Sequence, residues 1–107
     1  MSKSKIKKIL QELKHGLSEI LGERLEAVYL YGSHARGEAW AGSDVDVLIL
    51  IRGEFDFYSL MDTTSDLAWE LSLENDVVIS RVFMPAEKYW NGKTPFILNI
   101  QCEAISF

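Results

Sequence analysis

The sequence predicts an α+β fold, in which helices pack on a small mixed β-sheet. Three observations lead to this prediction. The chain has 107 residues, which suits a single compact domain over residues 1–107. Hydrophobic residues make up 48% of it, which is enough to build a core. Short apolar, β-branched runs are interspersed with longer segments of helical periodicity, in an order that favours helices packed on a sheet.

The first elements follow from apolar periodicity. Apolar residues recur three and four positions apart from Lys3 to Leu21, which predicts a helix, and Gly22 is a suitable stop. Residues 25–31 are apolar and partly β-branched, as expected for a buried strand. Gly32 ends that strand. The glycines and polar residues of 33–43 then predict a loop with a short helical turn.

The second half of the chain continues the alternation. It is predicted to contain a strand over Val45–Ile51, an amphipathic helix from about Asp56 to Glu74, a strand over Val77–Phe83, a short helix over Pro85–Trp90 and a last helix from Pro95 to about Ala104. Thr94 is the predicted cap of that last helix, because a threonine side chain can accept a hydrogen bond from the first free backbone N–H groups.

Charge and hydropathy exclude several functional classes. The net charge is −5, which argues against an extended nucleic-acid surface, because such a surface needs lysine and arginine to displace phosphate counterions. The lysines of the first helix are interpreted as a solvated face. No apolar run approaches the roughly 20 residues needed to span a bilayer, so no membrane span is expected. The lysine-rich start lacks a signal-peptide pattern, which makes the cytoplasm the expected location.

The single cysteine carries little chemistry. Cys102 has no partner for an internal disulfide and no neighbour at metal-ligand spacing. It is expected to be a small residue facing the core, because free cysteines are usually buried.

Two short motifs at strand ends carry the chemistry. Asp44 and Asp46 stand two residues apart at the start of a strand, so their side chains point to the same face. Two carboxylates on one face repel each other unless a cation lies between them. Magnesium is the natural occupant, because it takes oxygen ligands and is usually shared with substrate phosphates.

The other motif precedes the aspartates. Gly32 and Ser33 leave a strand at a turn, where glycine lets backbone N–H groups approach a phosphate and serine adds a hydroxyl donor. Arg36 adds a permanent, forked positive charge for phosphate oxygens. Two metal ions between the carboxylates and a triphosphate would align an attacking hydroxyl with the α-phosphorus and stabilise the departing pyrophosphate. Each motif alone is a common turn, and their order and spacing give the pair its meaning.

This pattern resembles a known family. The spacing Gly-Ser, ten residues, Asp-x-Asp is similar to that of the minimal nucleotidyltransferases of the DNA polymerase beta superfamily, and Gly-Ser-x-Ala-Arg-Gly with Ser-Asp-x-Asp resembles the MNT-domain group. The similarity covers about residues 25–105. It implies a polymerase-beta-like fold, triphosphate binding by Gly32 and Ser33, and magnesium binding by Asp44 and Asp46.

The family also carries a third carboxylate on a later strand, and Asp76 is the best match in this sequence. The resemblance implies that Asp76 completes the metal site and helps to deprotonate the attacking hydroxyl. Asp66 and Glu74 are competitors, but they precede the strand and are expected on the helix. The alternative for Asp76 is an ordinary turn residue between helix and strand.

MNT-domain proteins often serve as antitoxins paired with HEPN-domain toxins. The resemblance therefore implies magnesium-dependent transfer of AMP, or another nucleoside monophosphate, from ATP to a hydroxyl of a HEPN partner, with tyrosine the expected acceptor. One alternative is a domain that inhibits its partner by binding alone or only senses nucleotide. Another is transfer to a small molecule or an RNA end, of which the RNA version is disfavoured by the acidic charge balance.

Overall fold

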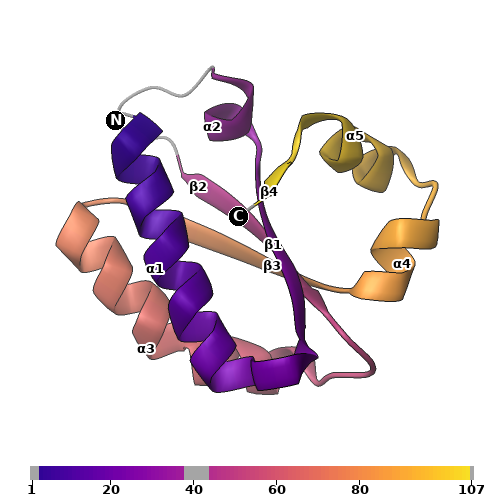
Figure 1. The fold of residues 1–107 in the computed structure, drawn as a ribbon, viewed down its shortest axis with the longest axis horizontal. Helices are drawn as coiled ribbons and strands as arrows, with labels where there is room; N and C mark the ends of the chain where they lie inside the picture. Colours follow the sequence, from indigo (N-terminus) through magenta and orange to yellow (C-terminus); the bar gives the residue numbers. More distant parts are fainter. Residues whose placement is uncertain (1–2, 38–43, 107) are drawn as a thin grey trace.

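A four-stranded mixed sheet separates two groups of helices in the computed structural model, which describes residues 3–37 and 44–106 (Figure 1). The helices α1 and α3 cover one face and α4 and α5 lie on the other, so the fold class predicted from the sequence is confirmed. The elements are α1 (Lys3–Leu21), the 3₁₀ turn η1 (Gly22–Arg24), β1 (Leu25–Tyr31), α2 (Ser33–Arg36), β2 (Val45–Ile51), α3 (Phe57–Asn75), β3 (Ile79–Pro85), α4 (Ala86–Asn91), α5 (Pro95–Glu103) and β4 (Ile105–Ser106).

The sheet brings several strand ends to one edge. Its strand order is β3-β2-β1-β4, with β1 antiparallel to both β2 and β4 and with β2 parallel to β3. The helix α3 forms the crossover that a parallel pair of strands needs. Because β1 runs against its neighbours, the end of β1 lies beside the beginnings of β2 and β4. Loops that contribute to a site can therefore meet at this edge.

The strand β2 is the centre of the core. Val47 and Ile49 belong to the cluster under α1 and α3, whereas Leu48 and Leu50 belong to the cluster under α4 and α5. All four side chains are fully buried. A strand covered on both faces reads as a continuous apolar run, which is why the Val-Leu-Ile-Leu-Ile segment has no polar alternation.

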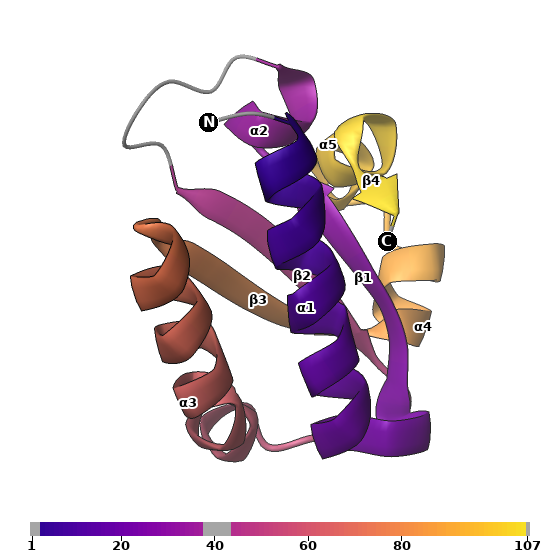
Figure 2. The same cartoon turned by 60° about the vertical axis from the view of Figure 1, so that its left-hand side comes forward.

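Close contact between α1 and α3 completes one layer. Figure 2 shows the two helices side by side on the same face of the sheet. On α1, Leu13 and Leu17 are fully buried. A Cβ atom at Gly16 would overlap the side chain of Leu67 on α3, so the glycine permits this approach. None of the helices in the described part of the chain is long and apolar enough to cross a membrane.

The predicted elements are present, with shifted boundaries. The strand expected from Val77 begins at Ile79, because α3 ends at Asn75 and Asp76 turns the chain in the left-handed conformation with a φ of 52°. The short helix expected from Pro85 begins one residue later, and Pro85 instead ends β3. Neither the turn η1 nor the two-residue strand β4 is predicted from the pattern. Residues 38–43 of the predicted loop lie outside the described residues.

The C-terminal helix begins as predicted. Thr94 Oγ1 accepts a hydrogen bond from the backbone N–H of Ile97 at 3.3 Å, and Pro95 occupies the first turn. The helix ends at Glu103, after which β4 pairs with Tyr29 and Leu30 of β1. The prediction that Cys102 faces the core is wrong, because Cys102, on α5, is exposed.

A matched pair of leucine substitutions tests the position of the core. Leu48→Ala should lower the free energy of unfolding by roughly 2–5 kcal/mol, because it leaves a cavity at the centre of β2. Leu98→Ala, on the exposed side of α5, should cost less than about 1 kcal/mol. Urea unfolding followed by circular dichroism measures both values. Equal losses would contradict the described burial.

Candidate functional site

The two motifs predicted to work together meet at the edge where β1 ends and β2 begins. Tyr31, the last residue of β1, pairs with Asp46 of β2. Gly32 therefore lies beside the carboxylates, with Asp44 just ahead of the strand. Asp44 is exposed and Asp46 is half-buried. The antiparallel pairing thus brings together residues that are 14 positions apart in the chain.

Gly32 is in direct contact with the carboxylate of Asp46. Its φ of 77° lies in the left-handed region, which side chains other than glycine rarely adopt. A Cβ atom at this position would also overlap the Oδ2 atom of Asp46. Two independent constraints therefore require a glycine at position 32, and one of them comes from the aspartate motif itself.

A single helical turn follows Gly32, as predicted. The backbone N–H of Arg36 donates to the carbonyl oxygen of Gly32 at 3.1 Å, and Gly37 ends the turn with a φ of 74°. This turn places Ser33 at its start and Arg36 at its end. We refer to residues 32–37 as the glycine loop. The loop presents backbone N–H groups, a hydroxyl and a guanidinium close to the aspartates.

The electrostatics of the edge favour a cation beside Asp46. Burial raises the pKa of Asp46 above its usual value, and the nearby charge of Asp44 raises it further. His34 and Arg36 act in the opposite direction on this pKa. Two neighbouring like charges, one of them partly buried, are the situation that a divalent cation relieves. Asp44 and Asp46 therefore suit a magnesium site, as oxygen ligands just ahead of β2 and within it.

Glu103 belongs to the site, although the sequence pattern does not identify it. Its Oε1 atom accepts a hydrogen bond from the backbone N–H of Gly32 at 3.1 Å, and its Oε2 atom accepts one from the Arg36 guanidinium at 3.0 Å. The hydrogen bond from Arg36 lowers the pKa of Glu103. The pKa of Tyr31 is raised first by burial, then by the charge of Asp46 and then by the charge of Glu103. A separation of 71 residues and the lack of any motif hide this partner from sequence reasoning.

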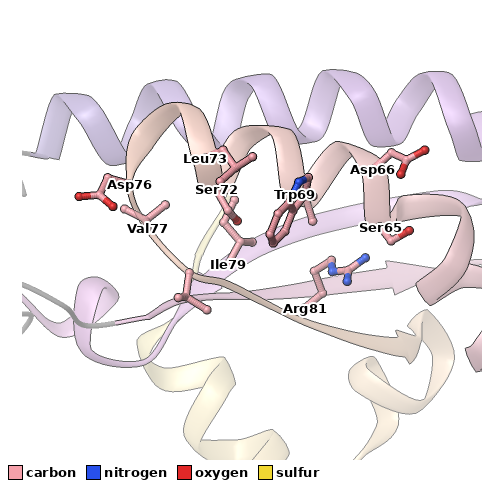
Figure 3. A pocket seen from close by; sticks show the side chains of 11 residues that line it. Ser65, Asp66, Trp69, Ser72, Leu73, Asp76, Val77, Ile79 and Arg81 are labelled. Atoms are coloured by element: carbon pink, nitrogen blue, oxygen red, sulfur yellow. The ribbon is translucent and has the colours of Figure 1, made fainter.

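Asp76 lies apart from the other two aspartates. It is the exposed cap at the end of α3 and lines a pocket of about 710 Å³ between α3 and β3. Figure 3 shows its carboxylate pointing away from Arg81 at the other end of that pocket. The β3 residue that pairs with Asp46 is Ser80. Asp76 thus occupies a turn between helix and strand, which is the alternative that its sequence context allows.

This placement bears on the predicted third carboxylate. Within residues 3–37 and 44–106, no three histidine, cysteine, aspartate or glutamate side chains come together closely enough to hold one metal ion. The competitors Asp66 and Glu74 both lie on α3, as expected. The structure therefore brings Asp44 and Asp46 to the glycine loop and does not bring Asp76 to them.

Part of the lysine-rich face of α1 borders the glycine loop. Lys3, Lys7 and Lys14 line a second pocket, of about 680 Å³, together with His34 and Gly37. Lys3 and Lys7 are exposed, as a solvated face requires. Their position nevertheless places positive charge beside the end of the loop.

Comparison with known proteins identifies the family of the chain. A family model described as polymerase beta nucleotidyltransferase matches residues 4–87, which include the glycine loop, Asp44 and Asp46. The chain belongs to this nucleotidyltransferase family. A relative from Methanocaldococcus jannaschii, named as a candidate protein adenylyltransferase, is 39% identical over 74 residues, which are 69% of this chain and 74% of the relative.

Solved structures share the fold of this nucleotidyltransferase. One is a toxin–antitoxin crystal structure with AMP-PNP, which contains a chain that is 20% identical to this one. The two chains align with a TM-score of 0.59, over 99% of this chain and 72% of the other. Another is the tri-AMPylated Shewanella oneidensis HEPN toxin in complex with its MNT antitoxin, with 18% identity, a TM-score of 0.57, and coverage of 99% and 71%. At these identities the likeness establishes the fold.

Substitution of Gly32 tests the contact between the two motifs. Gly32→Ala should destabilise the nucleotidyltransferase domain more than Gly37→Ala does. Both residues have a positive φ, but only a Cβ at position 32 meets another atom, while position 37 opens into free space. We expect a cost of roughly 1 kcal/mol at position 37 from backbone strain alone, and a larger one at position 32. Thermal unfolding measures both, and equal costs would contradict the contact.

The pKa of Asp46 provides a second test. In metal-free buffer, Asp44→Asn should lower the pKa of Asp46, because it removes a like charge. Asp76→Asn is the matched control and should leave that pKa unchanged. Carboxyl carbon shifts followed by NMR against pH report the value. A shift of equal size in the control would show that Asp76 is also close to Asp46.

The same raised pKa predicts a dependence of stability on pH. Because folding raises the pKa of Asp46, the folded state holds this proton at pH values where the unfolded state has released it. The free energy of unfolding should therefore fall as the pH rises from the usual aspartate pKa to above the pKa of Asp46 in the folded protein. Asp46→Asn should raise the melting temperature at neutral pH without metal, and this gain should disappear in acid. A gain that persists in acid would contradict the titration.

Proposed function

We propose that this nucleotidyltransferase transfers AMP from ATP to a tyrosine hydroxyl of a partner HEPN toxin and so neutralises it. The observation that carries the proposal is the contact between Gly32 and the carboxylate of Asp46. This contact joins the proposed phosphate-binding loop and the proposed metal-binding pair into a single site. Two comparisons support a protein as the acceptor. The relative from Methanocaldococcus jannaschii is named as a candidate protein adenylyltransferase, and one of the solved structures with a similar fold contains an AMPylated HEPN toxin.

The residues of the edge have distinct roles in this proposal. Gly32 and Ser33 bind triphosphate oxygens through a backbone N–H group and a hydroxyl, and Arg36 contributes a fixed positive charge. Asp44 and Asp46 hold magnesium, with two ions expected. When bound, magnesium neutralises charge on the phosphates and favours departure of pyrophosphate. The protein itself orients the triphosphate at the edge of the sheet where β1 ends and β2 begins.

The role predicted for Asp76, which is to complete the metal site and help to deprotonate the attacking hydroxyl, would require the end of α3 to come closer to β2 than it is in this structure.

Replacing the aspartate pair tests the chemistry. The double variant Asp44→Asn, Asp46→Asn should lose transfer, because the ligands for magnesium are gone, and it should keep the fold, because one side chain is exposed and the other half-buried. The unaltered domain is mixed with ATP, magnesium and the protein encoded by the adjacent gene as the candidate partner, and that partner is weighed by intact-mass spectrometry. Asp62→Asn, Asp66→Asn on α3 is the matched control. The proposal fails if the partner of the unaltered domain gains no nucleotide mass with any nucleotide tried.

A second candidate is a domain that inhibits its partner by binding alone. The position of Asp76 favours it, because within residues 3–37 and 44–106 Asp76 does not join Asp44 and Asp46 in a group that could hold one metal ion. The same double variant separates the two functions. Inhibition of the partner that persists in the variant identifies binding as sufficient, whereas loss of inhibition together with loss of transfer identifies catalysis.

A further inference from the structure

Glu103 occupies the donors that a nucleotide phosphate would need. Its two carboxylate oxygens accept hydrogen bonds from the backbone N–H of Gly32 and from the guanidinium of Arg36. These are the two groups of the glycine loop with the clearest affinity for an anion. A carboxylate resembles part of a phosphate in charge and in the spacing of its oxygens. The site is thus closed by a negative charge of the chain itself.

The fold delivers Glu103 to this position. It is the last residue of α5, whose inner face is anchored by the buried side chains of Ile97 and Ile100. The next residue continues the hydrogen-bonding of the helix, since the N–H of Ala104 donates to the carbonyl oxygen of Ile100 at 2.7 Å. The strand β4 then pairs with β1 immediately beside the glycine loop. The helix α5 before Glu103 and the strand β4 after it therefore fix the position of this residue.

The surroundings keep this carboxylate charged and partly shielded. Its side chain is 21% exposed, and it forms an ion pair with Arg36. Asp46 and Tyr31 both lie close enough to sense its charge. A triphosphate that approached with Glu103 in place would meet this negative charge at the same donors.

We propose that Glu103 acts as a resident phosphate mimic, which closes the glycine loop in the nucleotide-free protein and must be displaced by the nucleotide polyphosphate. The inference rests on the proposed nucleotide site. It assigns to Glu103 a role in setting nucleotide affinity, and it makes the C-terminal segment responsive to nucleotide. The competing role is that of a positioning residue, which holds Arg36 in place for the nucleotide and remains bound to it.

Glu103→Gln distinguishes the two roles, because glutamine keeps the size of the side chain and removes its charge. Displacement predicts that this variant binds AMP-PNP with magnesium, and inorganic tripolyphosphate without metal, about fivefold or more tightly than the unaltered chain. The matched control is Glu87→Gln on the exposed surface of α4, which changes the net charge equally and should leave affinity unchanged. Isothermal titration calorimetry measures the affinities. Equal or weaker binding by Glu103→Gln overturns the proposal, and weaker binding establishes a positioning role.

A measurement on the unaltered chain is independent of any variant. The Glu103 carboxyl carbon and the Gly32 amide should both shift in NMR spectra when tripolyphosphate binds, because their hydrogen bond breaks. A shift at Gly32 with no change at Glu103 contradicts displacement but leaves the nucleotide site intact. Absence of binding by every form of the chain contradicts the proposed function, and the inference fails with it.

Discussion

The site depends on the contact between Gly32 and Asp46. The chain must leave β1 with a positive φ and without a side chain, because the space that a Cβ would fill holds a carboxylate oxygen. This requirement explains why the loop that follows has its first N–H group beside the aspartates. The same contact brings together two elementary properties: glycine can adopt a positive φ, and the neighbouring carboxylates repel each other.

The sheet topology makes this contact possible. The antiparallel pairing of β1 and β2 places the end of one strand beside the beginning of the other, and burial of the apolar side chains of β2 on both faces fixes the register of that pair. A slip of one residue would send Leu48 and Leu50 into the opposite layer and turn Asp46 toward α1 and α3. The apolar core thus determines which way the carboxylate points.

Periodicity and turn chemistry predicted most of the fold and part of the site. The central strand was predictable because its apolar run is continuous, and the two long helices because apolar residues recur in them at helical spacing. Thr94 was predictable because a capping threonine before a proline is a local signal. The position of Asp76 was not, because the sequence Asn-Asp-Val-Val does not reveal where a helix stops and a strand starts. Glu103 was invisible for a different reason, since its contacts with Gly32 and Arg36 arise only from tertiary packing. The two-residue strand that follows it is too short to show any pattern.

The long-range tie between Glu103 and Gly32 has a consequence for the order in which the domain is built. Synthesis proceeds from the N-terminus, so the glycine loop and the aspartates leave the ribosome well before α5 and β4. Until these last elements arrive, the loop lacks the carboxylate that closes it and β1 lacks one of its neighbours. The hydrogen bond between Glu103 and Gly32 can therefore form only after α5 and β4 have been synthesised and packed on the sheet.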